Sequence, residues 1–216
     1  MDHFIGLALD IETLPNTDLV GMLPEPAPAK NIKDPEKIKA DIEKKRKDQI
    51  SKMGVNPLFS VILCICVHND KGAQGWVNES ADLAGEKKLL TDFFDYLDKN
   101  DVIKLVTYNG HEFDLPFIYR RAALAGAAPY KTLSHWGSKY SIDKHFDIMQ
   151  VWGHFREYIK LDTMAQVVLG QEKIDIDFTE FPELVKTPAG RKKILDYCAQ
   201  DTALTWEIYK KIEAVF

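Results

Sequence analysis

Alternating runs of apolar and polar residues divide the chain into predicted strands and helices. Apolar residues at Phe4–Leu9 predict a buried strand that ends at Asp10. Further strands are predicted at 60–67 (SVILCICV), at 74–80 (QGWVNES) and at 102–108. The turn NDKG joins the second strand to the third.

Helices are predicted mainly after these strands, where apolar residues recur at helical spacing. The expected ranges are 82–99 with Asp82 as its N-cap, 114–125, 148–158, 163–169, and from about 188 to the C-terminus. Residues 126–146 are expected to be irregular. Strands followed by helices favour an α/β fold with a central mixed sheet flanked by helices.

The segment between the first two strands has a different composition. Residues 14–28 are rich in proline and predict a loop, whereas 34–52 (DPEKIKADIEKKRKDQISK) predict a lysine-rich helix with thin contact to the core. A solvated helix and an arm that binds a nucleic-acid strand are both open interpretations. We therefore expect one domain covering 1–216, with a lysine-rich insertion at about 17–52.

Composition narrows the class of protein. The 216 residues are 45% apolar and 28% charged, with a net charge of −5, which disfavours binding of nucleic acid by bulk charge alone. The longest apolar run, 61–67, is too short for a bilayer, and the N-terminus leads into the first strand without a signal peptide. Cys64 and Cys66 alternate in an apolar run, which is typical of small core residues, so a cytoplasmic protein without membrane partners is expected.

Two carboxylates end the first predicted strand, in LALDIETLP. Asp10 and Glu12 are two residues apart and therefore share one face of the strand. Such a pair repels itself unless it faces solvent or a cation lies between its members. A solvated strand end and a metal site both remain open.

Two later motifs hold further candidates. Asp114 follows an Asn-Gly turn in YNGHEFDLPF, and its alternative role is an ordinary helix N-cap with proline in the first turn. Tyr197 and Asp201 are four apart in YCAQD and share one helix face, where a surface hydrogen bond is the alternative. HExxH, GxSxG, P-loop and zinc-binding spacings are absent from the sequence.

Together, DIET, YNGHEFDLPF and YCAQD resemble the three exonuclease motifs of the DEDDy branch of DnaQ-like 3′→5′ exonucleases. The sequence is most similar to the proofreading domains of family B DNA polymerases and to stand-alone predicted exonucleases related to them. The resemblance extends from about Ile5 to Lys211. It implies a ribonuclease H-like fold with a five-stranded mixed sheet, and two divalent ions, Mg²⁺ or Mn²⁺, as cofactors.

The resemblance also implies roles for the motif residues. Asp10 would bridge the two ions. Glu12 and Asp201 would complete the site of the attacking water, and Asp114 would hold the second ion, largely through water. Tyr197 would orient that water, because a phenol with a pKa of about 10 stays protonated at neutral pH and therefore acts as a hydrogen-bond partner and not as a strong base.

Other residues are candidates for substrate contacts. By the same resemblance, Leu14 would pack against the terminal nucleotide. Asn109, His111 and Phe113 lie in the second motif; Phe113 would stack on a base or pack in the core. Asp147 is expected to be a structural carboxylate or one that supports the metal ligands from behind. Contacts to phosphates or plain solvent exposure are expected for four basic residues: Arg120, Arg121, Lys192 and Lys193.

The function implied is a metal-dependent 3′→5′ exonuclease that removes nucleotides from the 3′ end of DNA and prefers single strands. An RNA 3′-end processing enzyme resembling ribonuclease D is an alternative within the same fold. A catalytically weak nucleic-acid-binding protein is a second alternative, although all four carboxylates are present. Proofreading would require a DNA polymerase or repair partner in trans.

Overall fold

The computed structural model describes residues 5–128, 141–154 and 156–216. Its strands form one mixed sheet in the order β3-β2-β1-β4-β5. β1 pairs antiparallel with β2 and parallel with β4, so it is the central strand. The predicted five-stranded α/β sheet is confirmed. The strands are β1 (Ile5–Pro15), β2 (Ser60–Asn69), β3 (Gly72–Val77), β4 (Val102–Thr107) and β5 (His145–Asp147).

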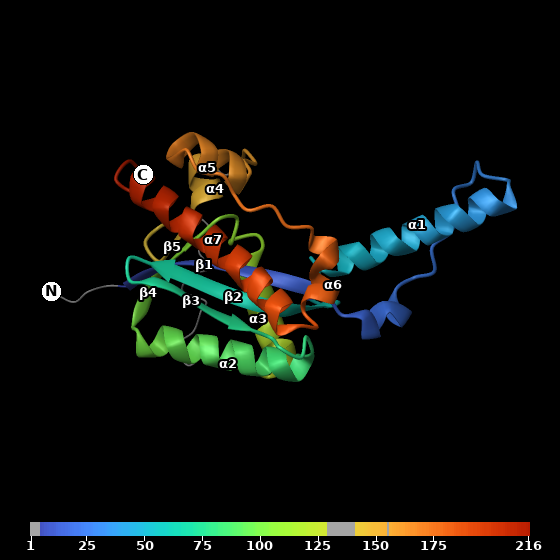
Figure 1. The fold of residues 1–216 in the computed structure, drawn as a ribbon. Helices are drawn as coiled ribbons and strands as arrows, with labels where there is room; N and C mark the ends of the chain where they lie inside the picture. The colour runs from blue at the N-terminus through green and yellow to red at the C-terminus, as the bar shows by residue number, and fades with distance from the viewer. Residues whose placement is uncertain (1–4, 129–140, 155) are drawn as a thin grey trace.

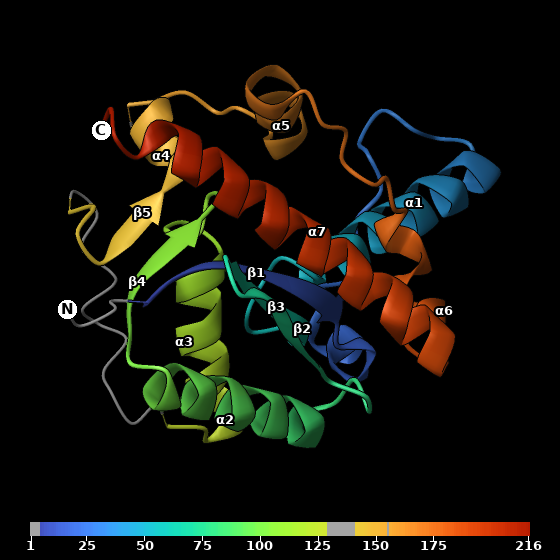
Figure 2. The same cartoon turned by 60° about the vertical axis from the view of Figure 1, so that its left-hand side comes forward.

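Helices cover both faces of the sheet (Figures 1 and 2). α2 (Leu83–Lys99) and α3 (Asp114–Ala125) pack on one face. The long helix α7 (Pro188–Ile212) crosses the other face over β1 and β2, with α5 (Leu161–Leu169) against it. The described elements also include two short helices, α4 (Ile148–Trp152) and α6 (Phe181–Leu184), two 3₁₀ turns, η1 (Thr17–Met22) and η3 (Phe178–Glu180), and the helix α1 (Pro35–Met53).

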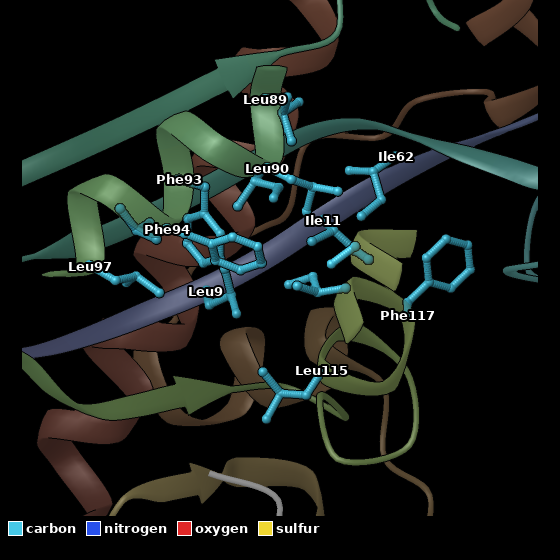
Figure 3. Close-up of a cluster of buried hydrophobic side chains, with 14 of the residues drawn as sticks. Leu9, Ile11, Ile62, Leu89, Leu90, Phe93, Phe94, Leu97, Leu115 and Phe117 are labelled. Carbon is cyan, nitrogen blue, oxygen red and sulfur yellow. The ribbon is translucent and has the colours of Figure 1, made fainter. Parts of the chain in front are cut away.

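The alternation of side chains along β1 divides the core. Leu7, Leu9 and Ile11 point to the α2/α3 face, where they meet apolar residues of both helices, such as Phe93 and Leu115 (Figure 3). Ala8 belongs instead to the cluster beneath α7. Asp10 and Glu12 lie two and four residues after Ala8, on the same face of the strand, and therefore face α7.

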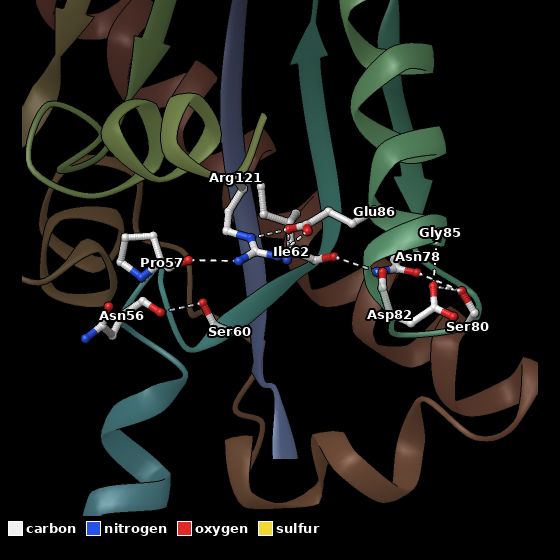
Figure 4. Close-up of polar contacts among 10 residues, drawn as sticks. All are labelled: Asn56, Pro57, Ser60, Ile62, Asn78, Ser80, Asp82, Gly85, Glu86 and Arg121. Atoms are coloured by element: carbon white, nitrogen blue, oxygen red, sulfur yellow. Dashed lines mark hydrogen bonds and ion pairs between the residues drawn. The ribbon is translucent and has the colours of Figure 1, made fainter. Parts of the chain in front are cut away.

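A buried ion pair joins the α2/α3 layer to β2 (Figure 4). Arg121 Nε donates to Glu86 Oε1 at 2.9 Å, and its Nη1 donates to the Pro57 carbonyl at 2.9 Å. The Ile62 backbone nitrogen also donates to Glu86, at 2.7 Å. The expectation that Arg121 contacts phosphate or solvent is wrong, because its side chain is 4% exposed and held by these partners.

The predicted insertion forms a projecting unit (Figure 1). Its helix α1 (Pro35–Met53) begins at the N-cap Asp34, and Met53 is its one buried residue, which confirms thin contact with the core. Residues 24–29 run back along the helix: Gln49 donates to the Pro24 carbonyl at 3.1 Å, and Ala29 donates to Asp41 at 2.9 Å. Where the insertion leaves β1 and returns to β2, Asn16 N donates to the Phe59 carbonyl at 2.8 Å.

Several boundaries differ from those expected. β1 continues through Asp10 to Pro15, because β2 pairs with it as far as Ser60 and satisfies its backbone groups. Residues 126–146 were expected to be irregular, but β5 begins at His145, within that range; residues 129–140 lie outside the described residues. The helix expected at 148–158 ends at Trp152 with Gly153 as its C-cap.

Among the residues that the structure describes, every helix is too short or too polar to cross a membrane.

Candidate active site

Two carboxylates lie side by side in the central strand. Asp10 pairs with Cys66 of β2 and Glu12 pairs with Cys64. The register shifts immediately afterwards, between Glu12 and Thr13. Such an irregularity bends a strand and re-aims its side chains.

Helix α7 brings a third carboxylate to the pair. Asp201 and Tyr197, one turn apart, are both buried, at 5% and 4% exposure. One oxygen each of Asp10, Glu12 and Asp201 lies within 4.8 Å of the other two. The interpretation of Tyr197 and Asp201 as a surface pair is wrong, since α7 turns both side chains toward β1.

The fourth carboxylate, Asp114, approaches from the other side of β1. Its Oδ1 accepts a hydrogen bond from the Ile11 backbone nitrogen at 3.2 Å, and its charge acts on Asp10. Phe113, not Asp114, occupies the N-cap position of α3 and makes no side-chain cap hydrogen bond. The N-cap alternative for Asp114 is therefore wrong, because Asp114 is the first helical residue and its carboxylate contacts β1.

Asp147 fixes the loop that leads to Asp114. Its two carboxylate oxygens accept hydrogen bonds from the backbone nitrogens of Asn109, at 3.0 Å, and His111, at 2.9 Å. Asn109 is held at a φ of 67°, a left-handed conformation that asparagine tolerates better than most residues. The expected structural role of Asp147 is confirmed.

Burial and mutual repulsion oppose ionisation of this cluster. Burial raises the pKa of Asp10 above its ordinary value, and the charges of Asp114 and Glu12 raise it further. Burial also raises the pKa of Glu12, and the charge of Asp201 adds to the effect. For Asp114, burial raises the pKa to about 7. The cluster therefore favours any cation that would neutralise it.

One such cation belongs to the chain. Lys173 Nζ lies 2.6 Å from Asp201 Oδ2 and 4.6 Å from the ring centroid of Tyr197. Burial lowers the pKa of this ammonium, but the carboxylate of Asp201 raises it more, and the net shift is upward. Burial likewise raises the pKa of the Tyr197 hydroxyl, so the phenol stays protonated. Lys173 offsets only part of the negative charge.

The donor set suits a hard divalent ion. Asp201 Oδ1 is buried and has no hydrogen-bond partner among the described residues, although it belongs to the three-carboxylate group. A buried, unpartnered carboxylate oxygen is costly, and a bound cation would satisfy it. Mg²⁺ and Mn²⁺ prefer such oxygen ligands, so the residues fit the ions that the motifs imply.

A pocket of about 650 Å³ opens over the carboxylates. Leu14 and Phe113 are on its wall, as a substrate-binding role requires, and Phe113 also packs against Phe117 with ring centroids 5.2 Å apart. The described residues that line the pocket include neither Asn109 nor His111. The lining residues are Asp10, Ile11, Glu12, Thr13, Leu14, Pro15, Lys47, Ile50, Ser51, Gly54, Val55, Phe113, Lys173, Phe178, Thr179, Pro182, Tyr197 and Asp201.

Three features of this pocket were not expected from the sequence. Lys173 lies in a polar loop, Phe178 opens a 3₁₀ turn, and the end of α1 belongs to the insertion. Nothing in the local sequence indicates that these three features line the pocket.

The cysteines Cys64 and Cys66, which were expected in the core, are buried, and their sulfurs lie within 4.8 Å of Cys198 Sγ.

The sheet order and the acidic pocket on its central strand define a protein of the ribonuclease H-like α/β class. Residues 56–215 match the family described as predicted 3′–5′ exonucleases related to the exonuclease domain of PolB. The chain belongs to this family. The matched range includes Asp114, Tyr197 and Asp201, whereas Asp10, Glu12 and the insertion precede it.

Similar proteins include much longer DNA polymerases. The DNA polymerase of Thermococcus aggregans is 26% identical over 147 residues, which are 60% of this chain and 8% of that protein. DNA polymerase 1 of Saccharolobus solfataricus is 28% identical over 139 residues, 57% of this chain and 15% of that one. The structure of the family B DNA polymerase from Pyrobaculum calidifontis superposes with a TM-score of 0.62 at 18% identity, covering 96% of this chain and 24% of that one. The chain thus corresponds to a small part of these relatives.

Proposed function

We propose that this protein is a metal-dependent 3′→5′ exonuclease that releases nucleoside monophosphates from the end of single-stranded DNA. The observation that carries the proposal is the group of three carboxylates within 4.8 Å beneath an open pocket. Membership of the exonuclease family supports the reaction, and the DNA polymerases among the relatives support DNA as substrate.

The cofactors proposed are two divalent ions, Mg²⁺ or Mn²⁺. Asp10, Glu12 and Asp201 would hold one ion, and Asp10 with Asp114 would hold the other. When bound, such ions lower the pKa of water and stabilise the alkoxide that leaves from the phosphodiester. They would also reverse the negative field of the cluster, which would otherwise repel a polyanion.

The remaining residues would position the reactants. Tyr197 keeps its proton, so its hydroxyl can donate a hydrogen bond to fix the attacking water but cannot serve as a strong base. Lys173 would hold the carboxylate of Asp201 in place and reduce repulsion of the phosphate. A preference for single strands would follow because a paired end could not enter the pocket to reach both ions.

A time course with labelled oligonucleotides tests the proposal. Single-stranded DNA and RNA of one sequence, labelled at the 5′ or the 3′ end, would be incubated with Mg²⁺, Mn²⁺ or EDTA. We expect the 5′-labelled DNA to shorten in single-nucleotide steps, the 3′-labelled DNA to release labelled mononucleotide at once, and EDTA to stop both. If RNA were shortened faster than DNA, the preferred substrate would be RNA and the function RNA processing. If neither were cleaved, the proposal would be refuted.

A further inference from the structure

The end of helix α1 is fixed beside the site carboxylates. Thr13, which follows Glu12 in β1, donates a hydrogen bond from Oγ1 to the Gly54 carbonyl at 2.6 Å. Gly54 also packs on the ring of Pro15, because a Cβ at Gly54 would lie 3.4 Å from Pro15 Cδ. Met53 is buried at 2% exposure. The insertion is therefore anchored one residue away from the metal-binding candidates.

One face of α1 is turned toward the pocket. The lining residues 47, 50, 51 and 54 are spaced i, i+3, i+4 and i+7, which places them on a single face of a helix. In Figures 1 and 2 this end of α1 lies next to α6, while the other end projects away from the sheet. The end of α1 and the η3–α6 segment thus both line the pocket.

The chemistry of this face suits a nucleotide. Ile50 and Val55 offer apolar surface to a base, and Phe178, at 56% exposure, offers an aromatic ring from the η3 side. Lys47, whose side chain is 76% exposed, supplies a cation at the mouth of the pocket. Its ammonium lies 3.2 Å from Glu43 in a solvent-exposed ion pair, and such pairs are weak, so a phosphate can displace the carboxylate at little cost.

Charge distribution favours the same occupant. The whole chain carries −5, whereas the sequence of α1 contains seven Lys and Arg residues and four Asp and Glu residues. The cationic segment is thus the one that ends at the pocket. The net negative charge of the chain would repel a polyanionic strand, whereas this helix would attract it.

We infer that the C-terminal turns of α1 form a binding site for the 3′ end of a single strand, in which Lys47 contacts a phosphate and Ile50 packs against a base. This inference rests on the proposed exonuclease function and deepens it. The insertion lies outside the residues that match the exonuclease family, which begin at 56. Because none of the lining residues of α1 is a candidate metal ligand, the insertion would act on affinity for the strand and not on the chemical step.

Matched substitutions on the two sides of α1 test the inference. Lys47→Ala would be compared with Lys52→Ala, which removes the same charge from the same helix at a residue that does not line the pocket. Ile50→Asn would be compared with Ile42→Asn by the same logic. Glu43→Gln would release Lys47 from its ion pair. Thermal unfolding would confirm that each variant is folded.

Affinity would be measured by anisotropy of a 5′-labelled single-stranded DNA in Ca²⁺, with electrophoresis to verify that the strand is uncut, and kcat and KM would be measured in Mg²⁺. Lys47→Ala and Ile50→Asn should each weaken binding about 3- to 10-fold, mostly through KM, and the two controls should stay within about twofold of wild type. Lys47→Ala should also reduce the slope of log K against log salt by about 0.7, and Glu43→Gln should tighten binding.

The outcomes separate this inference from the proposed function. Equal effects of Lys47→Ala and Lys52→Ala, or none from either, would overturn the inference while an active wild type preserved the exonuclease. A wild type that neither binds nor cuts the strand would overturn both.

Discussion

The side chain of Asp114 accepts a hydrogen bond from the backbone nitrogen of Ile11, at 3.2 Å. Ile11 lies between Asp10 and Glu12, so this bond joins the first residue of α3 directly to the strand that carries both carboxylates. The two motifs are far apart in the sequence, and the bond holds them in a defined relation before any ion binds.

Removal of a single carboxylate should eliminate cleavage without unfolding the protein. For Asp10→Ala and Asp201→Ala we expect at least about a 100-fold loss of rate, because metal catalysis supplies several kcal/mol. In EDTA the variants should be as stable as wild type or slightly more stable, since repulsion is relieved. Single-turnover cleavage and thermal unfolding test this, with the exposed Asp196→Ala on α7 as control. Normal cleavage by either variant would contradict the site assignment.

The metal-free protein should lose stability as the pH rises. A pKa of about 7 for Asp114 means that the folded state binds more protons than the unfolded chain, in which the carboxyl has a pKa of about 4. Stability should therefore fall between about pH 4 and 7, by an amount on the order of 1–3 kcal/mol for this residue. Asp114→Asn retains an oxygen for the bond from Ile11 and should flatten the profile.

Urea unfolding in EDTA at a series of pH values measures this effect. Addition of Mg²⁺ to wild type should also restore stability at high pH, because the bound ion neutralises the carboxylates. Parallel pH profiles for wild type and Asp114→Asn would contradict the raised pKa.

Loss of the Tyr197 hydroxyl should slow the reaction but not stop it. Tyr197→Phe keeps the ring against Lys173, at 4.6 Å, and removes only the hydrogen-bond donor. We expect kcat to fall about 10- to 100-fold, less than the roughly 100- to 10,000-fold typical of a general acid or base, because the hydroxyl only orients the water; KM should change little. Tyr96→Phe on α2 is the control. A rate equal to wild type would rule out the role in orienting water.

The ion pair between Arg121 and Glu86 should matter for stability and not for catalysis. Arg121→Ala would leave the carboxylate of Glu86 buried and without its charge partner, which costs about 3–5 kcal/mol. Arg120→Ala, the exposed neighbour, should change the free energy of unfolding by less than about 0.5 kcal/mol. Chemical denaturation measures both, and equal effects would contradict the structural role.

The sequence predicted the sheet and the acidic motifs because both depend on local periodicity. A strand with carboxylates two residues apart, or a helix with Tyr197 and Asp201 four apart, can be recognised without knowing what it packs against. Confirmed elements such as α2 and α7 have capping residues and regular apolar spacing. β5 was missed because it has only three residues.

Contacts that depend on tertiary arrangement could not be predicted in this way. Lys173 reaches Asp201 from an irregular loop, and lysines in such loops are usually exposed. Arg120 and Arg121 are neighbours in the sequence, yet the side chain of Arg120 is exposed and that of Arg121 is buried. The local sequence did not show which arginine would meet Glu86, because that acid lies on another helix.

The insertion also bears on how the chain folds. β1 and β2 are antiparallel neighbours, a pair that a tight turn commonly joins, but Pro15 pairs with Ser60 across the whole insertion. Closing so long a loop costs about 2 kcal/mol of chain entropy more than closing a short turn. Because folding rates fall as contacts become less local, this pairing should form late in the folding of the sheet. The insertion thus slows the assembly of the strand pair whose pocket it lines.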